Sequence, residues 1–249
     1  MNKKNIYFAS DFHFGAPDKD TSRERETRVI RWLDSIKEDA ERIFLLGDLF
    51  DFWHEYKTVV PKGNIRFLGK LAELTDAGIP IEVFTGNHDL WMYGYFEEEL
   101  GIPVHHEPQQ RVYHDKSFLI GHGDGLGPGD KTFKHVRKIF HNKFFQFIFR
   151  IVHPDIGIWI ANEWSKRSRG SHTEQEEFLG EEKEYLIAYC KTVLKTERID
   201  YFVFGHRHLP IEFEFADYAS TYFNLGEWFS QNNYGVYDGQ KMELREFTG

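Results

Sequence analysis

The stretch IEVFTGNHDL, residues 81–90, holds the pattern that decides the fold. A run of apolar, β-branched and aromatic residues stops at Gly86, and an amide, an imidazole and a carboxylate follow at Asn87, His88 and Asp89. A short run of this type indicates a strand that is buried on both faces. Polar side chains directly after such a strand indicate a ligand site at the carboxyl end of a sheet.

Four other runs along the chain have the same form, and each stops at a glycine or a polar residue. They are NIYFAS before Asp11, RIFLLG before Asp48, SFLIG before His122 and YFVFG before His206. Alternating polar and apolar residues with turn signals follow after residue 210, which predicts antiparallel strands. The five runs and this strand-rich end, with helical patterns between them, predict a layered α/β fold.

Helical periodicity occupies three of the intervening segments. It covers residues 23–38, 65–77 and 173–197. Gly78 is the expected C-cap of the second helix, because glycine adopts the left-handed conformation that closes many helices. Thr173 and Glu176 have the spacing of a capping box, so we expect the third helix to begin there.

Length, charge and cysteine content exclude several classes of protein. The 249 residues suffice for one large α/β domain or two small ones. A net charge of −9 argues against a nucleic-acid-binding protein, which needs a basic surface. The single cysteine, Cys190, lies in a helical pattern and is expected to be a buried, inert thiol. We see neither a leader sequence nor an apolar run of about 18 residues, and therefore expect a cytoplasmic protein.

Residues 131–169 differ in composition from the rest of the chain. Nine basic and two acidic residues give this segment a charge of +7, while the remainder carries −16. Apolar residues recur from Phe133 to Ile151 at steps of three and four, which indicates one face of a helix. Pro154 interrupts the pattern, and a second short helix is expected after it. The segment is either a surface helix pair that packs on the core or a basic, aromatic surface that meets a lipid or an anionic substrate.

Metal-competent side chains follow all five strand-like runs. They are Asp11 and His13, Asp48 and Asp51, Asn87 and His88, His122, and His206 and His208. One such residue is usually a cap or a structural histidine, but five endings of the same kind point to a shared site. Carboxylate, imidazole and amide ligands without thiolate suit Mn, Fe or Zn. The number of ligands allows two ions with a shared carboxylate, an arrangement suited to displacement at phosphorus.

The blocks DFH, GDLFD, GNHD, GHGD and GHRH resemble, in order, the five-block signature of the calcineurin-like metallophosphoesterases. The resemblance spans residues 11–208 and implies a sandwich of two mixed β-sheets flanked by helices, with an inserted helical cap. It implies one metal ion held by Asp11, His13, Asp48 and His208. It implies a second ion held by Asp48, Asn87, His122 and His206, with Asp48 as the bridge.

In the same family the histidine of the GNHD block lies near the phosphate, paired with the second aspartate of the GDLFD block. His88 and Asp51 are therefore the expected catalytic residues. His88 adjoins the ligand Asn87, so its side chain should diverge toward the substrate, and the Asp51 carboxylate would fix its tautomer. His88 could then stabilise charge on a phosphoryl oxygen or protonate the leaving group. For Asp89 we expect a helix cap.

Within that superfamily, HGDGLGPGDKTF, SKRSR, GHRHLP and NLGEWF resemble the UDP-2,3-diacylglucosamine diphosphatases of lipid A biosynthesis. This resemblance implies a phosphoesterase core over 1–124 and 172–249, and a cap over 125–171 that holds acyl chains. The implied substrate-binding residues are Asn87, His88, Asp130, Phe133, Arg167, Ser168 and Arg169. Enterobacterial members carry arginine at the position of His88; arginine grips a phosphate bidentately, whereas histidine can also move a proton.

The predicted function is hydrolysis of the pyrophosphate bond of UDP-2,3-diacylglucosamine to UMP and 2,3-diacylglucosamine 1-phosphate. The alternative is a phosphodiesterase or phosphatase that acts on another nucleotide diphosphate or a phospholipid-like substrate. A non-catalytic scaffold would have lost metal ligands, and here every implied position is filled. We expect Mn²⁺, with Fe or Zn as alternatives, and peripheral contact with the anionic cytoplasmic face of the inner membrane. Neither nucleic acid nor an obligatory protein partner is expected.

Overall fold

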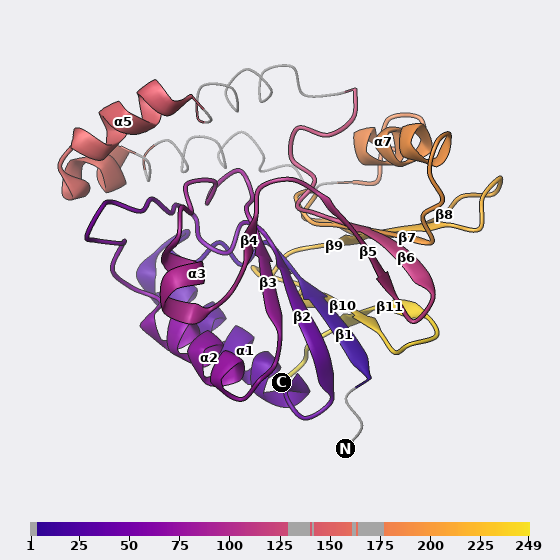
Figure 1. Ribbon diagram of the computed structural model, residues 1–249, viewed down its shortest axis with the longest axis horizontal. Coiled ribbons are helices and arrows are strands. Elements are labelled where there is room, and N and C mark those ends of the chain that lie inside the picture. The colour runs from indigo at the N-terminus through magenta and orange to yellow at the C-terminus, as the bar shows by residue number, and fades with distance from the viewer. Residues whose placement is uncertain (1–3, 129–139, 141, 161–162, 164–176) are drawn as a thin grey trace.

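Two mixed β-sheets pack face to face, and helices cover their outer faces (Figure 1). This computed structural model describes residues 4–128, 140, 142–160, 163 and 177–249. The first sheet has the order β11-β10-β1-β2-β3-β4, and the second has the order β5-β6-β7-β9-β8. The predicted layered sandwich of two mixed sheets is therefore confirmed.

The strands of the first sheet are β1 (Asn5–Ala9), β2 (Ala40–Leu46), β3 (Ile81–Phe84), β4 (Val104–His105), β10 (Asn233–Tyr237) and β11 (Met242–Glu246). Those of the second are β5 (Gln109–Tyr113), β6 (Lys116–Ile120), β7 (Tyr201–Phe204), β8 (Pro210–Glu214) and β9 (Thr221–Leu225). The labelled helices in the described part of the chain are α1 (Lys19–Ile36), α2 (Ile65–Asp76), α3 (Tyr95–Leu100), α5 (Lys143–Ile151) and α7 (Tyr185–Leu194).

The direction of pairing places the functional ends of the strands together. Strands β1 to β4 are parallel neighbours, and β6, β7 and β9 are parallel neighbours in the second sheet. The remaining strands pair antiparallel at the edges, as β10 does with β1. Because parallel strands end at the same edge, the residues after β1, β2 and β3 meet there, as do those after β6 and β7.

Successive side chains along a strand point to opposite faces, so the first sheet has an apolar core on each side. Phe8 points between the sheets, where it stacks on Phe44 at 5.3 Å and on Phe118 at 6.1 Å between ring centroids. Its neighbour Tyr7 packs on the opposite face in the cluster that contains Trp32 of α1. On the far side of the second sheet, α7 buries Cys190 among apolar side chains, and burial raises the pKa of this thiol well above its ordinary value. The expectation that this thiol is buried is confirmed.

Two of the three predicted helices are confirmed, and the third is shorter than predicted. The helix α1 starts four residues earlier than expected, because the Asp18 side chain accepts hydrogen bonds from the N–H groups of Asp20 and Thr21. Gly78 follows α2 with a φ of +79° and closes it as predicted. The prediction that the third helix begins near residue 173 is wrong for residues 177–184, where a turn at Gly180, with a φ of +88°, precedes α7. The predicted capping box lies outside the described residues.

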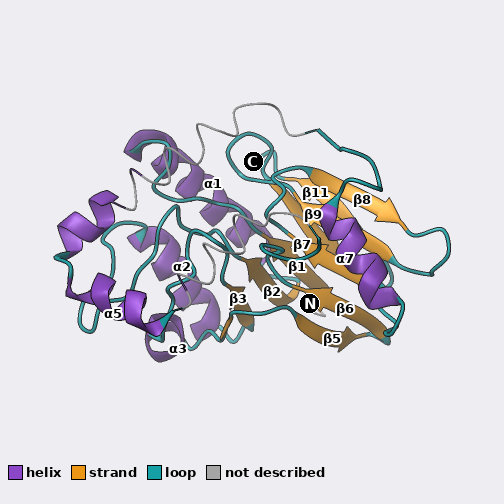
Figure 2. Ribbon diagram, turned by 90° about the horizontal axis from the view of Figure 1, so that it is seen from above, coloured by secondary structure: helices purple, strands orange, loops and turns teal. Residues whose placement is uncertain are grey.

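The described part of the basic insertion is helical on both sides of a break. Helix α5 ends before Val152, and residues 154–160 form a further helical segment that begins at Pro154. Proline is tolerated at a first helical position because its missing N–H would have no helical partner there. Figure 1 and Figure 2 show α5 on the same side of the molecule as α2 and α3, and on the opposite side from α7. The break at Pro154 and the second helix after it are confirmed; Phe133 lies outside the described residues.

Candidate metal centre

The loops after five strands bring the predicted ligand side chains into one cluster. Strands β1, β2 and β3 supply Asp11, His13, Asp48 and Asn87, and strands β6 and β7 supply His122, His206 and His208. Two sets of side chains have ligand atoms that all lie within 4.8 Å of one another. The first set is Asp11, His13, Asp48 and His208; the second is Asp48, His122 and His206.

The first set matches the first predicted metal site residue for residue. Nε2 of His13 lies 3.1 Å from Nε2 of His208 and 3.7 Å from Oδ1 of Asp11, which is itself 3.2 Å from Nε2 of His208. Ligands that bind one ion at about 2.1 Å are separated from one another by roughly 3.0–3.4 Å at tetrahedral or octahedral angles. Two imidazole nitrogens this close, with a carboxylate oxygen beside them, therefore have the spacing of ligands to a shared cation.

The second set contains Asp48 again, as a bridging carboxylate requires. Oδ2 of Asp48 lies 3.6 Å from Nε2 of His13 and 3.4 Å from Nε2 of His122. Oδ1 of Asn87 lies 3.4 Å from the same nitrogen of His122, which places the amide oxygen with this set. Nδ1 of His122 is 2.7 Å from the carbonyl oxygen of Leu46, so it donates its proton there and leaves Nε2 as the ligand atom.

The burial and charge of the cluster fit divalent cations. Oδ1 of Asp11 is buried and accepts no hydrogen bond of ordinary geometry from the described residues. Burial opposes ionisation of Asp11 and Asp48, but the surrounding imidazoles lower the pKa of both carboxyls well below the ordinary value. Burial, with repulsion from His122, lowers the pKa of His206 to about 3. These groups are therefore available as a neutral imidazole and two carboxylates, the forms that bind metal.

Strained backbone carries most of these ligands. Asp11, His13, Asp48, His206 and His208 all have φ between 44° and 70°. This left-handed conformation costs a residue other than glycine on the order of 1 kcal/mol, and it concentrates at functional sites. Main-chain hydrogen bonds between the β1 and β2 loops hold it, from the N–H of Asp11 to Gly47 and from that of His13 to Asp48. A Cβ at Gly86 would overlap the Asp48 carboxylate, so the third loop needs glycine at that position.

Asp89 does not cap a helix, and that prediction is wrong. Its carboxylate accepts hydrogen bonds from the N–H groups of Gly86 at 2.7 Å, Leu49 at 2.7 Å and Asp48 at 3.2 Å. The next helix begins later, with Gly94 as its N-cap. Burial and the Asp48 charge together raise the pKa of Asp89 to about 7. Asp89 therefore ties the third ligand loop to the second.

His88 lies beside the first ligand set, in a third cluster with His13 and Asp51. Its main-chain N–H donates to Oδ1 of Asp48 at 2.8 Å. Its Nδ1 lies 3.0 Å from the main-chain carbonyl oxygen of Asp51, whereas the Asp51 carboxylate is 3.8 Å away. The predicted pairing of the two residues is present, but the carbonyl and not the carboxylate sets the tautomer. With Nδ1–H directed to that carbonyl, Nε2 can donate to a phosphoryl oxygen only when the ring is doubly protonated.

Sequence reasoning missed two charged residues that support the cluster. Arg207, between the two histidines of the GHRH block, makes ion pairs with the buried Glu184 at 3.0 and 3.1 Å and so connects the β7 loop to α7. Arg25 of α1 is buried and donates to the carbonyl oxygens of Phe12 and His13 at 2.6 and 2.9 Å. Arg25 lies in the charged run SRERE, a pattern typical of a solvated helix face, so its burial could not be inferred from the sequence. Arg207 lies between two predicted ligands in the GHRH block, and this position could have marked it as part of the site.

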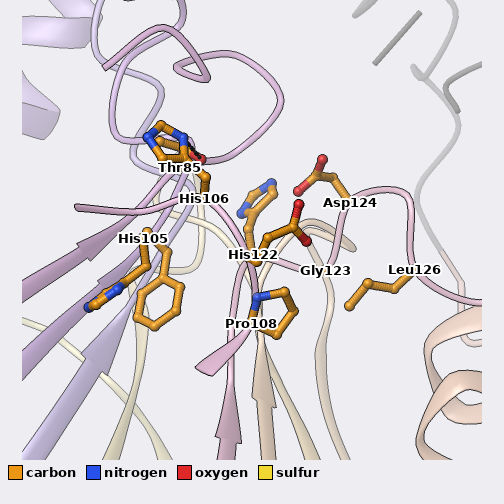
Figure 3. A pocket seen from close by; sticks show the side chains of 10 residues that line it. Thr85, His105, His106, Pro108, His122, Gly123, Asp124 and Leu126 are labelled. Atoms are coloured by element: carbon orange, nitrogen blue, oxygen red, sulfur yellow. Dashed lines mark hydrogen bonds between the residues drawn. The ribbon is translucent and has the colours of Figure 1, made fainter. Parts of the chain in front are cut away.

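A small cleft opens beside the second ligand set. Figure 3 shows the ring of His122 between His106 and the carboxylate of Asp124, with Pro108 and Leu126 below and beside them. Burial lowers the pKa of His106, so this ring is neutral near pH 7 and contributes no positive charge. The cleft therefore brings together the neutral ring of His106, the carboxylate of Asp124 and the proposed ligand His122.

The described part of the insertion packs on the loops that follow the ligands. Phe149 of α5 contacts Trp91 at 4.7 Å and Phe52 at 6.0 Å between ring centroids. Nε1 of Trp91 donates to the carbonyl oxygen of Phe140 at 3.0 Å. The other face of the insertion is apolar and exposed, at Phe144, Phe147, Ile148, Ile151 and Trp159. Among the predicted substrate-binding residues, Asp130, Phe133, Arg167, Ser168 and Arg169 lie outside the described residues.

The fold and the ligand cluster are those expected of a metal-dependent phosphoesterase, and comparison with known families gives the same class. The chain belongs to the calcineurin-like phosphoesterase family, whose match covers residues 4–210, and is thus a metal-dependent hydrolase. A relative from Porphyromonas gingivalis (strain W83), named UDP-2,3-diacylglucosamine hydrolase, is 34% identical over 97% of both chains. A relative of the same name from Proteus mirabilis is 27% identical and covers 88% of this chain and 90% of its own length.

One solved structure adds support for the fold alone. An archaeal phosphodiesterase superposes with a TM-score of 0.50 at 15% identity, over 97% of this chain and 98% of its own. Among the described residues, no helix is long and apolar enough to span a membrane.

Proposed function

We propose that the chain hydrolyses the pyrophosphate bond of UDP-2,3-diacylglucosamine, releasing UMP and 2,3-diacylglucosamine 1-phosphate. The observation that carries the proposal is an apolar helix packed on the loops that follow the ligands of a phosphoesterase metal centre. Helix α5 contacts Trp91, two residues after Asp89, and exposes Phe144 and Phe147 on its outer surface. A substrate with a nucleotide diphosphate and two acyl chains needs both a metal centre and an apolar surface. The relatives named above have this activity in their names.

The proposed metal centre uses the two ligand sets described above, completed by Asn87 in the second. A pair of divalent ions bound there supplies Lewis-acid stabilisation of the phosphoryl oxygens and an acidified water. We propose Mn²⁺ as the native ion, since the cluster has only oxygen and imidazole ligands and lacks thiolate. The main-chain carbonyls and Asp89 hold the ligands in place before an ion binds, which limits the reorganisation that binding requires.

His88 and Asp51 are the proposed catalytic residues. His88 in its doubly protonated form donates from Nε2 to a phosphoryl oxygen, while Nδ1–H remains on the Asp51 carbonyl. The Asp51 carboxylate lies 3.8 Å from the same nitrogen. This donor stabilises charge that develops on the phosphoryl group or protonates the leaving group. A histidine at this position can thus combine the contact that arginine makes in enterobacterial relatives with transfer of a proton.

The insertion is proposed to act as a cap over residues 125–171 that takes up the acyl chains. Asp130 and Phe133 would line it, and Arg167, Ser168 and Arg169 would contact the polar part of the substrate. The basic residues of the segment favour an anionic membrane surface, and we propose that the protein works peripherally at the cytoplasmic face of the inner membrane.

The test is release of UMP from UDP-2,3-diacylglucosamine in the presence of Mn²⁺, compared with UDP-glucosamine that lacks both acyl chains. We expect turnover of the acylated substrate to be strongly favoured. Equal turnover of the two would exclude the lipid substrate and leave a phosphoesterase for other nucleotide diphosphates. The Asp48→Asn variant should lose activity and bound metal. Asp39→Asn is its matched control, because Asp39 precedes β2 whereas Asp48 follows it.

A further inference from the structure

Two of the proposed ligand histidines differ in how their second ring nitrogen is held. Nδ1 of His122 has the carbonyl oxygen of Leu46 at 2.7 Å. Nδ1 of His13 is buried and makes no hydrogen bond to any described residue, and Oδ1 of Asp51 lies 3.9 Å from it. A metal-ligating histidine usually donates its other N–H to a fixed acceptor, which orients the ring. The orientation of His13 therefore needs another cause.

An aromatic ring covers the face of His13. The ring of Phe229 is stacked on it, with 5.4 Å between centroids and 29° between planes. His88 and His208 meet the same imidazole at 86° and 80°, so within the described structure these two rings limit its edges while Phe229 limits its face. Rotation of the His13 ring about its Cβ–Cγ bond would break this stacking with Phe229.

The segment that carries Phe229 is fixed to the loop that carries His13. The N–H of Trp228 donates to the carbonyl oxygen of Asp11 at 3.2 Å. The N–H of Phe229 itself donates to the carboxylate of Glu227, which is buried. The late block NLGEWF therefore places one aromatic side chain against one ligand.

Arg25 joins the two sides of this contact. Its guanidinium carbon lies 4.1 Å from the centroid of Phe229, a cation–π distance. The same guanidinium donates to the carbonyl oxygens of Phe12, His13 and Ala16. Only 2% of Arg25 is exposed, so this cation is a fixed part of the structure. It holds the main chain of His13 and the ring that stacks on its imidazole.

We propose that Phe229, held by Arg25, is a positioning residue that orients His13 toward the first metal ion. It takes the place of the hydrogen bond that orients His122. The inference rests on the ligand assignment proposed above, but it is independent of which phosphate substrate the enzyme cleaves. Its consequence is that the affinity of one of the two ions depends on an aromatic side chain far away in the sequence.

The test measures metal binding and not turnover. The metal-free full chain is titrated with Mn²⁺, and free Mn²⁺ is followed by electron paramagnetic resonance. Phe229→Leu should lower the affinity for one of the two ions by roughly tenfold or more, which is the usual effect of removing support from a ligand histidine. The affinity for the other ion should be unchanged. Phe229→Tyr keeps the ring and should restore the affinity. Phe229→Met, which also removes the ring, serves if the leucine variant does not fold.

Two comparisons separate positioning from a general loss of stability. Phe215→Leu removes a buried ring that contacts Phe202 and Phe213 in another core cluster, and it should leave both affinities unchanged. In a His13→Ala background, Phe229→Leu should cause no further loss, because the two side chains act on one ion. Wild-type affinity for both ions in the leucine and methionine variants would overturn the proposal. Failure of the wild-type chain to bind Mn²⁺ would remove the ligand assignment and the inference with it.

Discussion

Asp89 accepts a hydrogen bond from the main-chain N–H of Asp48, although 41 residues separate them in the sequence. The same carboxylate accepts from Leu49 and Gly86, so it closes the β2 loop against the β3 loop. The bridging ligand of the proposed metal centre is thus held by the last residue of the GNHD block. The backbone of Asp48, the residue that donates this hydrogen bond, is left-handed, with a φ of 51°.

Asp89→Asn should destabilise the protein and weaken metal binding together. The two carboxylate oxygens of Asp89 accept from these N–H groups, whereas an amide has only one oxygen. The NH₂ group of the amide would face a main-chain N–H, which is also a donor. A buried donor left without a partner costs about 1–3 kcal/mol. Urea unfolding of the metal-free protein should show a loss of this size. A variant as stable as the wild type would mean that the loops hold their shape without the carboxylate.

His88→Asn should lower kcat while both metal ions stay bound. His88 is outside both ligand sets, and removal of a positioned proton donor typically costs roughly 10²–10⁴-fold in rate. Metal content, measured by elemental analysis, should equal that of the wild type. His114→Asn is the control, since His114 is an exposed histidine paired with Glu41. Loss of metal in the His88 variant would assign that histidine to the ligands.

The sequence was sufficient to predict which residues meet, because parallel strands end at one edge of a sheet. Asp11, Asp48 and Asn87 follow short buried strands, and this local pattern needs no knowledge of the tertiary structure. The left-handed backbone of Asp11 and Asp48 could not be predicted, because contacts between separate loops stabilise it against the ordinary preference of these residues.

The failed predictions have a related cause. A helix cap was expected at Asp89 because capping is a local interaction, but its acceptor oxygens found donors on a loop about 40 residues away. The acceptor of His88 was taken to be the Asp51 side chain, and the main-chain carbonyl of the same residue lies closer. In α7 the helical pattern extended past the turn at Gly180, since a sequence period does not show where tertiary packing ends a helix.

Glu82→Gln should destabilise the protein at neutral pH and much less in acid. Glu82 is nearly buried and accepts from Arg42 and His105 at 2.7 Å each. Burial raises its pKa, but the His105 hydrogen bond and the Arg42 charge lower it below the ordinary value overall. The carboxylate's contribution is therefore complete above the pKa of an unfolded glutamate, roughly 4.3, and is lost as the pH falls through the lower folded pKa.

We expect the unfolding free energy of the glutamine variant to be lower by about 1.5–3 kcal/mol at pH 7, the range for hydrogen bonds to charged groups. Urea unfolding at pH 7, 5 and 4 measures the difference between variant and wild type. It should stay constant down to about pH 5 and shrink below that. A difference that grows in acid would contradict the sign of the pKa shift.

Two phenylalanines on α5 should separate docking of the cap from contact with lipid. Phe149 packs on Trp91 and Phe52, whereas Phe144 is 65% exposed on the same helix. Aromatic contacts are worth about 1 kcal/mol, so Phe149→Ala should lower kcat/KM for the acylated substrate by roughly five- to tenfold. Hydrolysis of bis(p-nitrophenyl) phosphate, which lacks acyl chains, should be unchanged.

Phe144→Ala should keep both activities in detergent and reduce binding to anionic vesicles in a flotation assay. If the two variants behave alike in every assay, the helix does not have one face for the core and another for the membrane.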